Sequence, residues 1–189
     1  MHIMRLLAAI ILAVGLAAPA AAQRVDLPTE AMQPSQYYAL LGRIDSFNTA
    51  MQTNDMSVIM SVIPPKVLEA ISAQFGVTNE QLIEASQQQL DAAMETIKLE
   101  SFGMDVQNAE FYRLADGMLY GLLPTETVMD LGEAGGKIRA KASTLALLDG
   151  DTWYLVRVED AQQVGILKTV YPQFVDVTFP TGSMEPVTQ

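Results

Sequence analysis

The sequence predicts an α+β domain in which N-terminal helices pack on one face of a curved antiparallel sheet and a short helix follows the sheet. Residues 35–94 carry apolar residues at helical spacing. From residue 97 the pattern changes to alternation, interrupted by the tight-turn sequences Ala-Asp-Gly at 115–117 and Asp-Gly-Asp at 149–151. Such turns join neighbouring antiparallel strands, so we expect the second half of the chain to form a meander.

The N-terminal segment, residues 1–22, has the layout of a secretory signal peptide. Arg5 supplies the positive charge, residues 6–17 are apolar, and three alanines that end at Ala22 provide a cleavage site. The apolar run is shorter than the roughly 20 residues that cross a bilayer. An uncleaved N-terminal anchor is the alternative interpretation. With cleavage after Ala22, we expect export to a bacterial periplasm and no integral membrane association.

Cleavage would also remove His2, the only histidine of the 189-residue chain. The chain has no cysteine, which excludes disulfides and a lipid anchor on cysteine, so a hydrophobic core must supply the stability. The length favours one domain over residues 35–179. We expect a flexible leader at 23–34 and a flexible tail at 180–189.

The first helices are predicted from their caps and breaks. After the polar leader, Ser35 is the expected N-cap of a helix over residues 36–52. Asp55 follows and caps a second, short helix. Pro64 and the proline after it end that helix.

A third and a fourth helix follow these prolines. The third covers residues 66–74 and ends at Gly76, a typical C-terminal signal. Thr78 and Gln81 have the spacing of a capping box and open the fourth helix, which reaches about residue 94.

Alternating residues then predict five strands. Their ranges are 97–102, 106–114, 118–131, 137–148 and 152–158. Pro124 interrupts the third of them, which indicates an edge, a bulge or a bend. Residues 132–136 (GEAGG) are interpreted as a turn; a phosphate-binding loop is the alternative, but this loop joins two strands and does not open a helix.

The end of the domain is predicted to be helical and then extended. Asp160 is the expected N-cap of a short helix that Pro172 stops. Residues 175–179 alternate and are expected to form a final strand.

The order of these elements, the two hairpins and the segment Asp-Gly-Asp-Thr-Trp-Tyr at 149–154 resemble the nuclear-transport-factor-2-like superfamily, also called the cystatin-like cone fold. The resemblance implies that the helices and a concave sheet face enclose a pocket. It leaves the activity open, because some members are enzymes with an acid/base residue in the pocket and others bind ligands or partners. It also implies that a homodimer could form through the sheet face.

Composition excludes many classes of site. A mature chain without His and Cys cannot hold a Ser-His-Asp or Cys-His nucleophile system, and zinc or haem ligation by these residues is lost as well. Nucleotide-binding Gly-rich motifs and calcium-loop motifs are absent from the sequence. The methionines could suggest copper(I), but they are scattered, and Met56 and Met60 fit a packing stripe better. We therefore expect no metal and no cofactor.

The net charge of -11 argues against nucleic acid as a partner. A negative balance of this size keeps a protein soluble and repels anionic surfaces. A basic protein partner or a cationic ligand remains electrostatically allowed.

Candidate site residues lie on the predicted strands. Glu110 and Tyr112 share a strand face, and Tyr120 on the next strand can approach them. A buried Glu110 with raised pKa could act as a general base, or the three groups could bind a polar ligand. A solvated glutamate beside half-buried tyrosines is the alternative.

Three further residues are candidates for ligand binding. Arg139 shares one strand face with Lys141 and could meet a ligand there. Trp153 and Arg157 alternate on the last strand, and Arg157 on the inner face would suit a carboxylate. A cross-strand partnership between Arg157 and an acidic residue is the alternative.

Three functions follow. The first is an exported, non-catalytic domain that binds a small ligand or a protein partner. The second is a cofactor-free acid/base enzyme, isomerase-like or lyase-like, that uses Glu110 with Tyr112 and Tyr120. The third is a structural module that dimerises through its sheet face. Enclosure of the Glu110 carboxylate in a pocket would favour the enzyme, and exposure would argue against it.

Overall fold

A computed structural model describes residues 22–25, 32–132 and 135–187 of the chain. The expected signal peptide, except Ala22, lies outside the described residues. The helices are α2 (Pro34–Thr53), α3 (Met56–Ser61), α4 (Pro65–Phe75), α5 (Asn79–Met94), α6 (Ala161–Val170) and the 3-10 helix η2 (Pro172–Phe174). The strands are β1 (Gln23–Val25), β2 (Lys98–Met104), β3 (Glu110–Arg113), β4 (Leu119–Asp130), β5 (Lys137–Asp149), β6 (Thr152–Arg157) and β7 (Ser183–Pro186). The predicted α+β class is confirmed.

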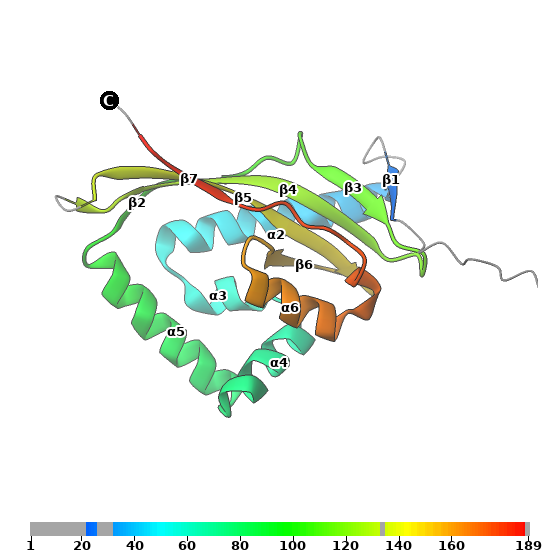
Figure 1. Cartoon of the computed structure of the whole chain (residues 1–189), viewed down its shortest axis with the longest axis horizontal. Helices are drawn as coiled ribbons and strands as arrows, with labels where there is room; N and C mark the ends of the chain where they lie inside the picture. Colours follow the sequence, from blue (N-terminus) through cyan, green and yellow to red (C-terminus); the bar gives the residue numbers. More distant parts are fainter. Residues whose placement is uncertain (1–21, 26–31, 133–134, 188–189) are drawn as a thin grey trace, which may run out of the picture.

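The long β4–β5 hairpin is the spine of a curled antiparallel sheet (Figure 1). Along β4, strand β3 pairs with the first part and β2 with the second. Along β5, strand β6 pairs with residues 144–149 and β7 with residues 138–141. We call the β3–β6 end of the hairpin the proximal half of the sheet and the β2–β7 end the distal half.

The proximal half is covered on both faces. Its inner face, which carries Ala146 and Trp153, packs against Leu40 and Ile44 of α2. Its outer face, which carries Leu145 and Tyr120, packs against α4, α6 and η2 through the core residues Val67, Leu167, Tyr171 and Phe174. The helices therefore cover both faces of this half, whereas the sequence pattern led us to expect them on one face only.

The free edge of β6 is also covered. The backbone N–H of Leu155 donates to the carbonyl of Val62, between α3 and α4, at 2.7 Å. An uncovered edge strand would invite pairing with another chain. The α3–α4 connection thus carries the chain around the sheet edge, from the inner face to the outer face.

Most predicted helix ends are confirmed, but the start of α2 is not. Asp55, Thr78 with Gln81, and Asp160 cap their helices as expected. Ser35, however, lies inside α2, whose N-cap is Gln33 and whose first residue is Pro34. Proline fits the first turn because its missing N–H has no helical partner to lose there.

The two ends of the domain carry strands that the sequence did not predict. Residues 175–179 do not form the expected strand; Val177 and Phe179 instead pack on the outer-face core without pairing. The strand β7 lies in the segment expected to be a flexible tail, where it pairs with β5. Likewise, β1 lies in the expected leader and pairs with β3. Backbone pairing needs no alternation of side chains, so neither strand is visible in the pattern.

Within the described ranges, no helix combines the length and the apolarity that crossing a membrane requires.

Candidate functional site

The predicted acid/base residues come together on the outer face of the sheet. Tyr112 on β3 donates its hydroxyl hydrogen to Glu110 Oε2 at 2.7 Å. Its ring stacks on that of Tyr120, with centroids 5.1 Å apart and planes 16° from parallel. Alternation along β3 and the register Tyr112–Tyr120 produce this arrangement.

The environment of this cluster does not match that of a general base. Glu110 forms an ion pair with Arg24 at 3.1 Å, and 43% of its side chain is exposed. Burial, together with the neighbouring Tyr112, raises the pKa of Tyr120 to about 12. Burial and the bond to Glu110 also raise the pKa of Tyr112. The cluster therefore holds two tyrosines with raised pKa beside a partly exposed glutamate that is paired with Arg24.

Arg139 takes part in a cross-strand network on the outer face of the distal half. Its Nε lies 3.2 Å from Glu126 on β4, and its Nη1 lies 3.7 Å from Glu185 on β7. Lys141 also reaches Glu185, at 3.1 Å. These partners tie β7 to the spine of the sheet, which gives Arg139 a structural role.

Trp153 is a core residue. It is 2% exposed, and its indole N–H donates to the backbone carbonyl of Gln36 at 2.8 Å. A buried indole needs such a partner, and here the bond fixes the first turn of α2 to β6. Trp153 offers no surface to a ligand.

Arg157 lies on the inner face, in register with Thr144, and forms an ion pair with Glu159. Its side chain is 63% exposed. Desolvation by the surrounding protein lowers the pKa of the Arg157 guanidinium. The partner of Arg157 is acidic, as its alternative required, but it lies two residues further along the chain and not on a neighbouring strand. Arg157 and the Glu110 cluster lie on opposite faces of the sheet.

A polar cluster that the sequence did not suggest joins α4, the end of β5 and the residue between α6 and η2. Asp149 Oδ2 accepts a hydrogen bond from the Tyr171 hydroxyl at 2.8 Å and one from Lys66 at 3.1 Å. Burial by itself would raise the pKa of Asp149, but the hydrogen bonds from Tyr171 and Lys66 outweigh it, so the pKa of this carboxyl lies below its ordinary value. Burial and the bond to Asp149 raise the pKa of Tyr171. The cluster fastens the outer-face helices to the sheet.

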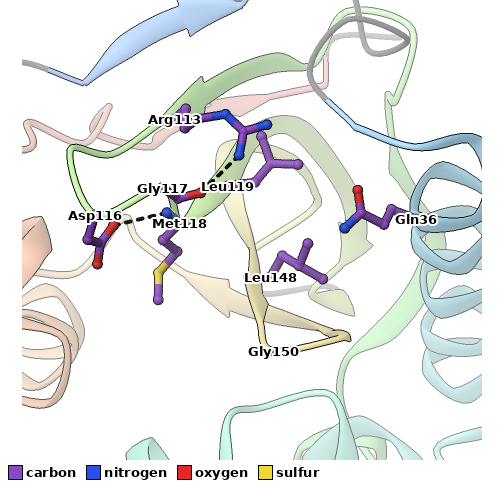
Figure 2. A pocket seen from close by; sticks show the side chains of 8 residues that line it. All are labelled: Gln36, Arg113, Asp116, Gly117, Met118, Leu119, Leu148 and Gly150. Carbon is purple, nitrogen blue, oxygen red and sulfur yellow. Dashed lines mark hydrogen bonds between the residues drawn. The ribbon is translucent and has the colours of Figure 1, made fainter.

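The first pocket, which we call the turn pocket, has a volume of about 370 Å³ and lies where the two predicted hairpin turns meet (Figure 2). Arg113 and Gln36 approach it from opposite sides, with Leu119 and Leu148 between them. Arg113 donates to the carbonyl of Gly117 at 2.9 Å, and Asp116 accepts from Met118 N–H at 2.9 Å. Both charged groups thus stabilise the turn. The sequence feature that could have predicted this pocket is the pair of turn sequences, because antiparallel pairing brings both turns to the same end of the sheet.

The second pocket, the α5 pocket, lies between the C-terminal ends of α2 and α5 and the start of β2. Its volume is about 320 Å³. Its apolar lining residues are Met51, Met94, Leu99 and Phe102, and its polar ones are Gln52, Asn54, Lys98, Glu100 and Ser101. Glu100 binds Lys137 Nζ at 2.6 Å, so its carboxylate is already paired. The one carboxylate among the pocket's lining residues is therefore engaged in an ion pair.

Helix α5 adjoins this pocket and is incompletely covered. Its apolar stripe consists of Leu82, Ile83, Leu90, Ala93 and Met94, all of which are only partly buried, and no residue of α5 is fully buried. The helix packs against α3 and α4 and runs from α4 to β2 along the side of the molecule (Figure 1). Phe75, the last residue of α4, is 63% exposed, and Val77, between α4 and α5, is 37% exposed.

In the part of the chain that the structure describes, no three His, Cys, Asp or Glu residues are grouped so as to hold a metal ion. Searches of family models, curated proteins and solved structures find no match to this chain. The fold and the sites define an α+β domain with a curled antiparallel sheet and a pocket at each end of α2.

Proposed function

We propose that this chain is an exported, non-catalytic binding domain whose binding surface is the α5 stripe together with the α5 pocket. The single observation that carries the proposal is the incomplete burial of this stripe along the whole helix. Met94 belongs to both the stripe and the pocket, so the two form one continuous apolar surface.

The physical argument concerns what an amphipathic helix normally does. A helix of this kind gains its stability in a globular protein by burying its apolar side. Apolar surface left in contact with water forgoes about 25 cal/mol per Å². A contiguous apolar surface with polar borders is typical of an interaction site. We infer that α5 completes its burial by binding another molecule.

The acid/base alternative has weaker support. The carboxylate of Glu110 is paired with Arg24 and is 43% exposed. Glu110, Tyr112 and Tyr120 line neither the turn pocket nor the α5 pocket. A catalytic base must contact its substrate, and a substrate bound in either of these two pockets would not contact Glu110.

The structural alternative, dimerisation through a sheet face, is also weaker. Helices cover both faces of the proximal half. The outer face of the distal half carries the ion pairs of Arg139 and Lys141, whose desolvation would be costly. A dimer would have to break or bury these pairs.

The superfamily and the compartment belong to the proposal as well. The curled sheet with helices packed on it agrees with the cone fold that the sequence resembles. Residues 1–22 support export to the periplasm.

Native mass spectrometry of the chain isolated under mild conditions from the cells that make it tests the binding function. We expect a bound small molecule or partner in the wild type and its loss in Leu90→Ser/Met94→Ser. Glu110→Gln is the matched control and should retain the bound mass. A bare wild-type monomer, a homodimer without other bound mass, or loss in the control alone would contradict the proposal.

A further inference from the structure

The two sides of the α5 stripe differ in charge. Glu80, Glu84, Asp91 and Glu95 are spaced four, seven and four residues apart, which places them in one row along the helix. All four are exposed. We call them the acidic row.

No positive charge balances the acidic row within its own segment. Residues 76–97 contain no Lys, Arg or His. The first turn of α5 lowers the pKa of Glu80 through a backbone hydrogen bond and the Thr78 hydroxyl, which keeps that carboxylate ionised. The α5 stripe is therefore bordered on one side by a line of four negative charges, and on the other side by the neutral residues Ala85 and Gln89.

We propose that α5 docks a basic amphipathic segment of a partner protein, with apolar residues against the α5 stripe and Lys or Arg along the acidic row. This inference rests on the proposed binding function and specifies its partner. The charge pattern requires the partner to present one apolar and one cationic row at helical spacing, as in helix-in-groove recognition.

The same pattern argues against the other occupants of an apolar helix face. A second copy of this chain would bring its own acidic row against the first, and like charges opposite each other oppose association. An anionic lipid surface would be repelled for the same reason. The chain as a whole, at -11, would steer a cationic partner toward it.

The test measures binding of an approximately 18-residue Leu/Lys amphipathic helical peptide to the full mature chain by fluorescence anisotropy. We expect binding that weakens about tenfold in Glu84→Gln/Asp91→Asn/Glu95→Gln and that also weakens at high salt. Glu80 is left in place because it stabilises the start of α5. Leu90→Ser should weaken binding by a similar factor through the apolar side.

The matched control is Asp45→Asn/Asp151→Asn/Asp176→Asn, which removes the same charge from exposed positions on other elements and should change binding less than about twofold. Equal weakening in both triple variants, or equally tight binding of a Leu/Glu peptide, would overturn the inference. If native mass spectrometry finds a bound small molecule while the Leu/Lys peptide does not bind, this inference fails and the proposed binding function stands. Circular dichroism of each variant confirms that it is folded.

Discussion

Gly121 on β4 shows how closely single residues are fitted in the inner-face core. A Cβ atom at this position would lie 2.7 Å from Cε1 of Phe111, whose side chain is 1% exposed. No side chain larger than hydrogen fits unless the Phe111 ring moves. Gly165 in α6 is the opposite case, because nothing lies within 4 Å of a Cβ built there.

The two glycines give a paired prediction. Gly121→Ala should lower the free energy of unfolding by about 1–3 kcal/mol through overpacking. Gly165→Ala should raise it by about 0.5–1 kcal/mol, because alanine restricts the unfolded chain and suits a helix. Urea denaturation followed by the fluorescence of Trp153, the only tryptophan, measures both. Equal free energies of unfolding for the two variants would contradict the close contact between Gly121 and the Phe111 ring.

Tyr120 predicts how stability depends on alkaline pH. The folded state raises the pKa of Tyr120 to about 12, whereas the ordinary pKa of a tyrosine is near 10. Folding therefore favours the neutral form of this side chain. This contribution is fully present below about pH 10 and is lost as the pH rises toward 12, by about 1.4 kcal/mol for each pKa unit. Tyr120→Phe should make that fall shallower. Tyr38→Phe, at a side chain that is 71% exposed, should leave it unchanged. The free energy of unfolding of the wild type and both variants, measured from pH 8 to 12, tests this prediction.

Some residue-level features follow from the sequence and others do not. The meeting of Glu110, Tyr112 and Tyr120 follows from alternation and a tight turn, since both act over short distances. The ion pair of Glu110 with Arg24 does not, because β1 pairs by backbone alone. That pair, unseen in the sequence, is what weakens the catalytic hypothesis.

At the scale of elements, α2 and α5 differ in how they are held. Helix α2 buries Leu40, Ile44 and Ala50, and Trp153 anchors its first turn. Helix α5 buries no residue completely and relies on its capping box and its packing on α3 and α4. Both helices have clear sequence signals, but their degree of burial depends on where the chain places them.

Hydrogen exchange should therefore distinguish the two helices. We expect backbone amides of α5 to exchange through local opening, faster than those of α2 by at least about tenfold, because local stability follows burial. Hydrogen–deuterium exchange with mass spectrometry on the unbound protein gives the comparison. Equal protection of α5 and α2 would mean that α5 is as fully packed as α2, and would remove the basis for the binding surface.

The C-terminal strand illustrates where element prediction from sequence ends. Residues 175–179 alternate, yet they lie on the outer-face core, and pairing with β5 falls instead to β7. The edge of β5 beyond β6 is free to accept any extended segment that reaches it, and Glu185 adds pairs to Arg139 and Lys141. Long-range pairing of this kind leaves no periodic trace.

At the scale of the whole molecule, the chain is acidic, and the sheet's proximal half is enclosed by helices. The α+β class was predictable because helical and alternating segments occupy separate halves of the sequence. The coverage of both sheet faces was not, because it depends on how α4 and α6 meet in space.

Export is a prediction about the whole chain. Expression in a Gram-negative host should yield a periplasmic protein whose intact mass corresponds to cleavage after Ala22. Replacement of two residues in the apolar segment 6–17 by Asp should keep the full-length chain in the cytoplasm. A full-length, membrane-bound product from the unaltered chain would instead support the uncleaved anchor.

The most direct test of the binding account is a hydrogen-exchange footprint of the chain with its captured molecule, compared with the same chain after that molecule is removed. The account predicts that protection rises in α5 and at residues 51, 52, 54 and 98–102, which line the α5 pocket. Protection that rises at residues 110–112 and 120 while α5 stays unchanged would contradict it, and would return Glu110 and its tyrosines to the centre of the function.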